Sequence, residues 1–131
     1  MVNYKVMIIP IIFFISITFG ALGAILMKLG ASHLGIIEFN SVQAVFKFIL
    51  KLFTNFTIVG GMFLYFLSAV AWTFLLTKLD ISYVQPILSL TYLLTPILAF
   101  LIIGEHVPLA RWVGIGIIII GVYVIAKTSG S

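Results

Sequence analysis

The sequence predicts an all-α integral membrane protein, with four transmembrane helices and a short amphipathic interfacial helix between the first and the second. Three observations lead to this prediction. First, 63% of the 131 residues are hydrophobic and only 8% are charged, whereas soluble domains contain about 45–50% and about 25%. Second, the charged residues divide the chain into four long apolar runs. Third, a chain of this length cannot bury so much apolar surface in a water-soluble core. We expect residues 1–131 to form a single transmembrane domain.

The first apolar run predicts a transmembrane helix over about residues 6–27. This run has no charged residue, and it is longer than the roughly 20 residues that cross a hydrocarbon core of about 30 Å. It also exceeds the apolar stretch of about 7–15 residues in a signal peptide, so we expect a retained helix rather than a cleaved leader.

The region that follows predicts an interfacial helix over about residues 40–52. Asn40, Gln43, Lys47 and Lys51 recur at helical spacing and define one polar face. The opposite face is almost entirely apolar, which a solvated connector does not explain. Such a helix lies in the headgroup layer of a membrane and directs its lysines toward lipid phosphates.

Three further apolar runs predict transmembrane helices over about residues 55–77, 81–104 and 109–126. Helices are expected because lipid offers no hydrogen-bond partners to an irregular backbone. Two prolines in the third run, Pro86 and Pro96, each remove a backbone hydrogen bond and predict a helix that bends. The basic residues are divided almost evenly between the segments on the two sides of the membrane, so the orientation of the protein in the membrane stays open.

Polar and aromatic side chains lie on one face of the second and of the third predicted transmembrane helix. Gln85 is the most costly of them to leave against lipid, so we expect it to point inward. These faces either line a passage for a substrate or hydrogen-bond one helix to another. The aligned residues are Gly61, Tyr65, Ser68 and Trp72 on the second helix, and Gln85, Ser89, Tyr92 and Pro96 on the third.

Lys28 ends a stripe of small residues in the first helix, formed by Ser16, Gly20 and Ala24 at intervals of four. Small residues at this spacing allow another helix to approach closely. Lys28 itself has two interpretations. It is either a snorkelling flank at the membrane boundary or a cation at the entrance of a groove that accepts an anionic headgroup.

Two glycines in the fourth helix predict a surface for self-association. Gly114 and Gly121 are seven residues apart and therefore lie on nearly the same face. We expect this face to form the interface of a homodimer, with a hetero-oligomer as the alternative.

The four predicted spans contain no Asp or Glu. Glu38, Asp80 and Glu105 all lie between the apolar runs, whereas a proton-coupled transporter usually needs a titratable group at membrane depth. The chain has no cysteine, and its two histidines lie in separate polar segments, so we expect no metal and no cofactor. The basic residues are scattered between apolar blocks and no nucleophile, base and acid stand together, so we expect neither a nucleic-acid partner nor an enzyme.

Three segments resemble proteins of the drug/metabolite transporter superfamily. Residues 23–28, Gly-Ala-Ile-Leu-Met-Lys, resemble the end of the first helix in small multidrug resistance proteins. Residues 79–90, Leu-Asp-Ile-Ser-Tyr-Val-Gln-Pro-Ile-Leu-Ser-Leu, resemble the opening of the third helix in four-helix EamA-type proteins. Residues 104–114, Gly-Glu-His-Val-Pro-Leu-Ala-Arg-Trp-Val-Gly, resemble their loop into the last helix. The resemblance is strongest to the small subunits of the aminoarabinose lipid flippase, whose loop has the order His-Glu-Pro.

The resemblance implies a multi-pass protein of a prokaryotic cytoplasmic membrane that flips a polyprenyl-phosphate-linked sugar or a similar amphipathic, lipid-linked substrate. Lys28 and Arg111 would bind the phosphate, and Glu105 is the only acid near the groove. The alternatives are an exporter of small drugs or polyamine cations, and a non-transporting subunit of a larger membrane complex. Small multidrug resistance proteins keep an essential glutamate where this sequence has Gly20, so proton-coupled export of cationic drugs is not implied. The expected lining residues of the passage are Tyr65, Trp72, Tyr83, Gln85 and Ser89.

Overall fold

The computed structural model describes residues 4–128, and over that range the chain consists of helices and the segments that connect them. The four predicted spans are confirmed: helices long and apolar enough to cross a membrane cover Met7–Ser32, Phe56–Leu76, Ile81–Ile103 and Leu109–Ala126. The helices, in chain order, are α1 (Tyr4–Ser32), α2 (Val42–Thr54), α3 (Phe56–Leu76), α4 (Ile81–Leu88), α5 (Thr91–Leu98), the π-helical turn η1 (Ala99–Ile103) and α6 (Leu109–Ala126).

Helix α1 continues about one turn beyond the span predicted from charge, so Lys28 lies within the helix rather than at its end. A lysine marks the boundary of an apolar run, but it does not stop a helix. The last turn is closed by side chains instead. The Ser32 hydroxyl donates to the Leu29 carbonyl oxygen at 2.7 Å, and the His33 ring nitrogen Nδ1 lies 2.8 Å from the same oxygen.

Helix α2 forms where the sequence predicts an amphipathic helix. Ser41 caps it, since its hydroxyl accepts the Ala44 backbone N–H at 3.2 Å. No residue of α2 is buried by the rest of the chain, and Val42 is 86% exposed. The apolar face is therefore uncovered within the chain. Its place in the headgroup layer stays a prediction.

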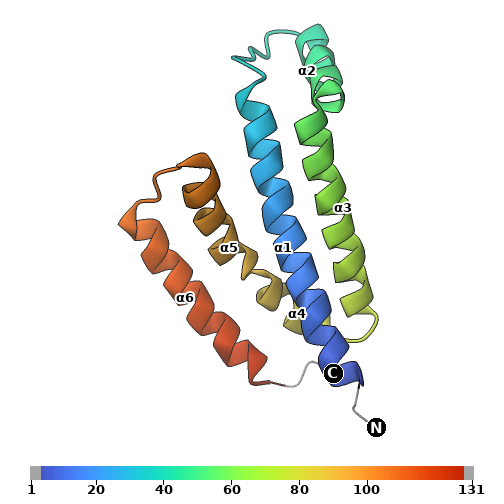
Figure 1. The fold of residues 1–131 in the computed structure, drawn as a ribbon, viewed down its shortest axis with the longest axis vertical. Coiled ribbons are helices and arrows are strands. Elements are labelled where there is room, and N and C mark those ends of the chain that lie inside the picture. Colours follow the sequence, from blue (N-terminus) through green and yellow to red (C-terminus); the bar gives the residue numbers. More distant parts are fainter. Residues whose placement is uncertain (1–3, 129–131) are drawn as a thin grey trace.

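Helices α1 and α3 form a tightly packed pair (Figure 1). At the centre of the pair the two backbones touch, because a Cβ atom on Gly23 would lie 2.8 Å from the Gly61 carbonyl oxygen. A Cβ atom on Gly61 would lie 2.7 Å from the Gly23 carbonyl oxygen. Both distances are too short for a real side-chain atom. Glycine at both positions is what permits this approach.

Hydrogen bonds fix the pair on either side of the glycine contact. The Ser68 hydroxyl donates to the Ser16 carbonyl oxygen at 2.7 Å, and the Ser16 hydroxyl donates to the Ser68 carbonyl oxygen at 3.0 Å. Toward the other end, the Asn55 side-chain amide donates to the Gly30 carbonyl oxygen at 3.2 Å. The three contact points on α1 are Ser16, Gly23 and Gly30, at intervals of seven rather than the predicted four.

The third span is interrupted between its two prolines, which themselves lie inside the helices on either side. Helix α4 ends at Leu88 and α5 begins at Thr91. Between them the backbone bonds change to three-residue spacing: Ser89 N–H donates to Pro86 at 3.1 Å and Leu90 N–H to Ile87 at 3.1 Å. The Ser89 hydroxyl also donates to the Pro86 carbonyl oxygen. This oxygen is thus satisfied although the helix stops.

The helices form two layers, with α1 and α3 in one and α4, α5 and α6 in the other (Figure 1). Helix α5 packs on α1, and α6 packs on α4 at the outside of the bundle. The C-terminal ends of α3 and α6 lie at the same end of the molecule as the beginning of α1, and α2 lies at the opposite end (Figure 1).

We expect Gly61→Ala to lower the free energy of unfolding by about 1–3 kcal/mol, because the added methyl group must push α1 and α3 apart. Denaturant unfolding in detergent, followed by far-UV circular dichroism, measures this. Gly60→Ala is the matched control, since a Cβ atom on Gly60 meets no atom within 4 Å. Equal losses in the two variants would contradict the close glycine contact.

Candidate functional site

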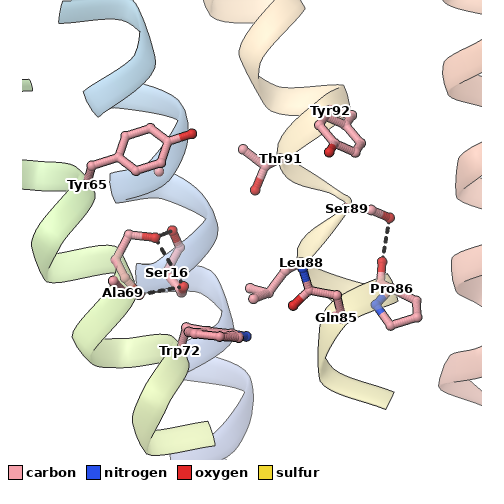
Figure 2. Close-up of a pocket in the computed structure, with 12 residues that line it drawn as sticks. Ser16, Tyr65, Ala69, Trp72, Gln85, Pro86, Leu88, Ser89, Thr91 and Tyr92 are labelled. Atoms are coloured by element: carbon pink, nitrogen blue, oxygen red, sulfur yellow. Dashed lines mark hydrogen bonds between the residues drawn. The ribbon is translucent and has the colours of Figure 1, made fainter. Parts of the chain in front are cut away.

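A cavity of about 580 Å³ lies between the α1–α3 pair and the α4–α5 segment (Figure 2). We call it the central cavity. Its walls combine hydroxyl groups, one amide and three aromatic rings with apolar side chains, and none of its lining residues is charged. The lining residues are Ser16, Gly20, Tyr65, Ser68, Ala69, Trp72, Gln85, Pro86, Leu88, Ser89, Thr91 and Tyr92.

Trp72 and Gln85 face the central cavity from opposite sides, one from α3 and the other from α4 (Figure 2). The Trp72 indole nitrogen is buried and has no hydrogen-bond partner among the described residues. A buried N–H without a partner is costly, more so in a protein surrounded by hydrocarbon. Trp72 is thus a donor without a partner among the described residues, and it lies across the central cavity from an amide that can both donate and accept.

The interruption of the third span shapes the second wall of the cavity. Gln85 and Ser89 come from the last turn of α4 and the break itself, and Thr91 begins α5. A continuous helix would present these residues in one regular spiral. The break allows both half-helices to direct polar groups toward α1 and α3.

Apolar packing closes the central cavity toward the end where α1 begins. Phe13, Leu75 and Val84 form a buried cluster there, with Leu75 and Val84 fully buried. Tyr83 packs against this cluster. The side chain of Tyr83 does not line the central cavity.

A second cavity of about 340 Å³ lies toward the α2 end, and we call it the charged cavity. Three ionisable side chains stand on its lining: Lys28 from α1, Glu105 from the loop after η1, and Arg111 from the first turn of α6. Arg111 Nη1 lies 3.7 Å from Glu105 Oε1, with the two side chains 61% and 40% exposed. The rest of the lining is largely apolar, formed by Ala24, Ile25, Thr95, Pro96, Ala99, Ile103 and Val107.

The backbone around Gly104 places Glu105 at the charged cavity. Gly104 has a φ of 73°, a left-handed conformation that glycine adopts without strain. This turn brings the Glu105 backbone N–H to the Ala99 carbonyl oxygen at 3.1 Å. Val107, which is buried, then anchors the loop before α6 begins.

The two cavities follow one another along the same two helices. Gly20 lines the central cavity and Ala24, one turn later, lines the charged cavity. On α5, Tyr92 lines the first cavity and Pro96, again one turn later, lines the second. The two cavities are therefore neighbours, about one helical turn apart along α1 and α5.

The structure divides the predicted site residues between the cavities. Tyr65, Trp72, Gln85 and Ser89 meet in the central cavity, whereas Lys28, Glu105 and Arg111 meet in the charged cavity. The predicted interface glycines, Gly114 and Gly121, lie apart from both, on α6. A Cβ atom on either would meet no atom within 4 Å, which leaves their role as an interface a prediction.

Sequence reasoning missed some of the lining. Thr91 and Thr95 lie outside the predicted polar face, although a hydroxyl group in an apolar span is the usual signal of an inward-facing position. The small-residue stripe predicts only a packing role for Ser16 and Gly20. They pack against α3 and also line the central cavity.

Four helices long and apolar enough to cross a membrane, with an uncharged cavity between them, indicate a multi-pass integral membrane protein. The model of the EamA-like transporter family matches residues 7–127, so the chain belongs to this family of membrane transporters within the drug/metabolite transporter superfamily. The predicted superfamily resemblance is thereby confirmed at this level, and the family is one of transporters rather than enzymes. No curated protein and no solved structure matches the sequence. The likeness to the aminoarabinose lipid flippase is not supported by any match.

We expect Trp72→Phe to change the free energy of unfolding of the empty protein by less than about 1 kcal/mol, because removing an unpartnered buried N–H offsets the packing lost with the smaller ring. Ser68→Ala should cost more, since it removes the hydroxyl that donates to Ser16. Denaturant unfolding of both variants in the same detergent makes the comparison. A larger loss for Trp72→Phe would show that its N–H is hydrogen-bonded in the empty protein.

Proposed function

We propose that this chain moves an amphipathic, lipid-linked substrate across the membrane, and that the substrate carries a polyprenyl phosphate linked to a sugar or to a similar polar group. The observation that carries the proposal is the succession of two cavities with different chemistry along α1 and α5. One is uncharged and the other has a positive excess. A lipid-linked sugar phosphate likewise has an uncharged part, the sugar, and a charged part, the phosphate.

The central cavity suits an uncharged, hydroxyl-rich group. Tyr65, Trp72 and Tyr92 provide aromatic faces that stack on the apolar face of a sugar ring, and their polar atoms can hydrogen-bond to its hydroxyls. Gln85 donates and accepts, so it fits a hydroxyl in either direction. Trp72 N–H would gain in the substrate the acceptor that it lacks in the chain.

The charged cavity suits a phosphate with a lipid chain attached. Lys28 and Arg111 contribute two positive charges against one negative charge from Glu105. The guanidinium group binds two phosphate oxygens at once. The surrounding apolar side chains offer a surface for the first prenyl units of the lipid.

Export of cations fits this arrangement less well. Glu105 is the only acidic residue that lines either cavity, and Arg111 already faces it at 3.7 Å. A cation approaching Glu105 would also meet Lys28. The net charge of the lining therefore repels cations rather than attracting them.

We place the working protein in a prokaryotic cytoplasmic membrane as a homodimer with α6 at the interface. Within the chain α6 packs mainly on α4, and its glycines leave open space on the outer side. Small residues there allow a second copy of α6 to approach closely. A larger hetero-oligomer through the same face is the alternative.

We expect Lys28→Ala to slow the transport of a fluorescent polyprenyl-phosphate-linked sugar in proteoliposomes more than Lys47→Ala does. Lys28 lines the charged cavity, whereas Lys47 lies on exposed α2, away from both cavities. The rates are compared at equal protein content. Equal rates in the two variants would contradict a role for Lys28. Uptake of an organic cation that stops when a protonophore collapses the proton gradient would favour the cation exporter instead.

We expect Gly121→Leu to reduce the dimer fraction in detergent, because a large side chain would hold two α6 helices apart. The fold of the single chain should tolerate it, since Gly121 faces open space. Sedimentation and chemical crosslinking measure the dimer fraction. Gly60→Leu, at another open glycine on α3, is the control. An unchanged fraction in Gly121→Leu would exclude this face as the main contact.

A further inference from the structure

The ion pair in the charged cavity is loose. Arg111 Nη1 and Glu105 Oε1 are 3.7 Å apart, which is longer than a hydrogen bond between charged groups. Both side chains remain accessible. Lys28 stands on the same cavity lining and forms no ion pair with a described residue. The cavity therefore contains two cations and one weakly held carboxylate.

We propose that Glu105 is a replaceable counter-ion of Arg111, and that the phosphate of the substrate displaces it. This inference rests on the proposed function. In the empty protein the carboxylate lowers the repulsion between Lys28 and Arg111. In the loaded protein the phosphate takes its place, and Glu105 moves to the water at the rim.

When substrate is present, the geometry favours replacement of Glu105 by the phosphate at Arg111. In the proposed substrate the phosphate is a diester with one negative charge and two free oxygens. These oxygens can bind the guanidinium and ammonium groups together, a contact that the Glu105 carboxylate, 3.7 Å from Arg111, does not make. The first prenyl units of the substrate would lie against Ile25, Ala99 and Ile103, apolar side chains that Glu105 cannot use when it returns to Arg111. Glu105 lies on a loop connection outside the helices, so it can turn away without disturbing helix packing.

The same carboxylate also favours release. When Glu105 returns to Arg111 it competes with the phosphate for one partner, which shortens the stay of the substrate. Removal of the carboxylate should therefore raise affinity and slow turnover together. Loss of a cation-binding acid would lower the affinity for the transported molecule instead, so the sign of the change distinguishes the two roles.

The test uses the full chain in detergent and citronellyl phosphate, a short prenyl monophosphate, as the probe, with citronellol as the uncharged reference. We expect Glu105→Gln to bind citronellyl phosphate about two- to fivefold more tightly, the range typical of a partly exposed ion pair. Glu105→Ala should shift affinity in the same direction, and it serves as the second variant if Glu105→Gln is unstable. Arg111→Gln should bind more weakly. None of these variants should change the affinity for citronellol.

Glu38→Gln is the matched control, because it removes the same charge from an exposed acid outside both cavities. Its affinity for citronellyl phosphate should equal that of the unmodified protein. In the background of Arg111→Gln, the further change Glu105→Gln should bring no gain. In proteoliposomes Glu105→Gln should transport the lipid-linked sugar more slowly despite the tighter binding.

The outcomes separate the inference from the function on which it rests. If the unmodified protein binds citronellyl phosphate and transports the lipid-linked sugar while Glu105→Gln binds no more tightly, the exchange of counter-ions is wrong and the function stands. A gain that persists without Arg111, or that Glu38→Gln shares, also overturns the exchange, because it reflects net charge alone. If the unmodified protein neither binds the probe nor transports the sugar, the proposed function fails and the inference fails with it.

Discussion

The contact between the backbones of α1 and α3 is the constraint on which the rest of the structure depends. Gly23 and Gly61 allow this contact, and the Ser16–Ser68 and Gly30–Asn55 hydrogen bonds hold it in register. Because α3 occupies one face of α1, α5 must pack on another, and α3 meets the α4–α5 segment only lightly. The central cavity is the space that this divergence leaves. Its width is therefore set in large part by glycines that do not line it.

The interrupted third span forms the wall of the central cavity opposite α1 and α3. Its position agrees with where an irregular backbone is tolerated in a membrane. An irregular backbone is tolerated at membrane depth only where it is buried in protein or lines a cavity. Pro86 weakens the helix, and the Ser89 N–H and hydroxyl both satisfy the Pro86 carbonyl oxygen at the point of interruption. The break lies on the central cavity, as discontinuous helices commonly do in transporters. Thus the weakest part of the span is also the part that presents polar groups inward.

Much of this could be predicted from the sequence, because hydropathy and helical amphipathicity are local properties. The four spans and α2 follow from them, and so do Tyr65, Trp72, Gln85 and Ser89 as inward-facing residues. Neighbour relations between helices could not be predicted. Positions four apart advance by about 40° around a helix, so a stripe that begins against α3 at Ser16 has turned about 120° by Lys28. Lys28 therefore faces the charged cavity with α5 and α6. Tyr83 lies two residues from Gln85, on nearly the opposite face of α4, where it packs on the apolar cluster.

The separation of neutral from charged groups follows from the cost of placing ions in hydrocarbon. Charges deep in the membrane are expensive, and the central cavity is lined by uncharged polar, aromatic and apolar groups, whereas Lys28, Glu105 and Arg111 all lie toward the α2 end. For the proposed substrate this sets an order of events. The sugar can enter the central cavity while the phosphate stays with Lys28 and Arg111, because no lining residue deeper in the protein would neutralise it. Passage of the phosphate then requires the apolar cluster of Phe13, Leu75 and Val84 to open. The helices must therefore rearrange to let the charged phosphate pass, whereas the sugar can enter the central cavity without that rearrangement.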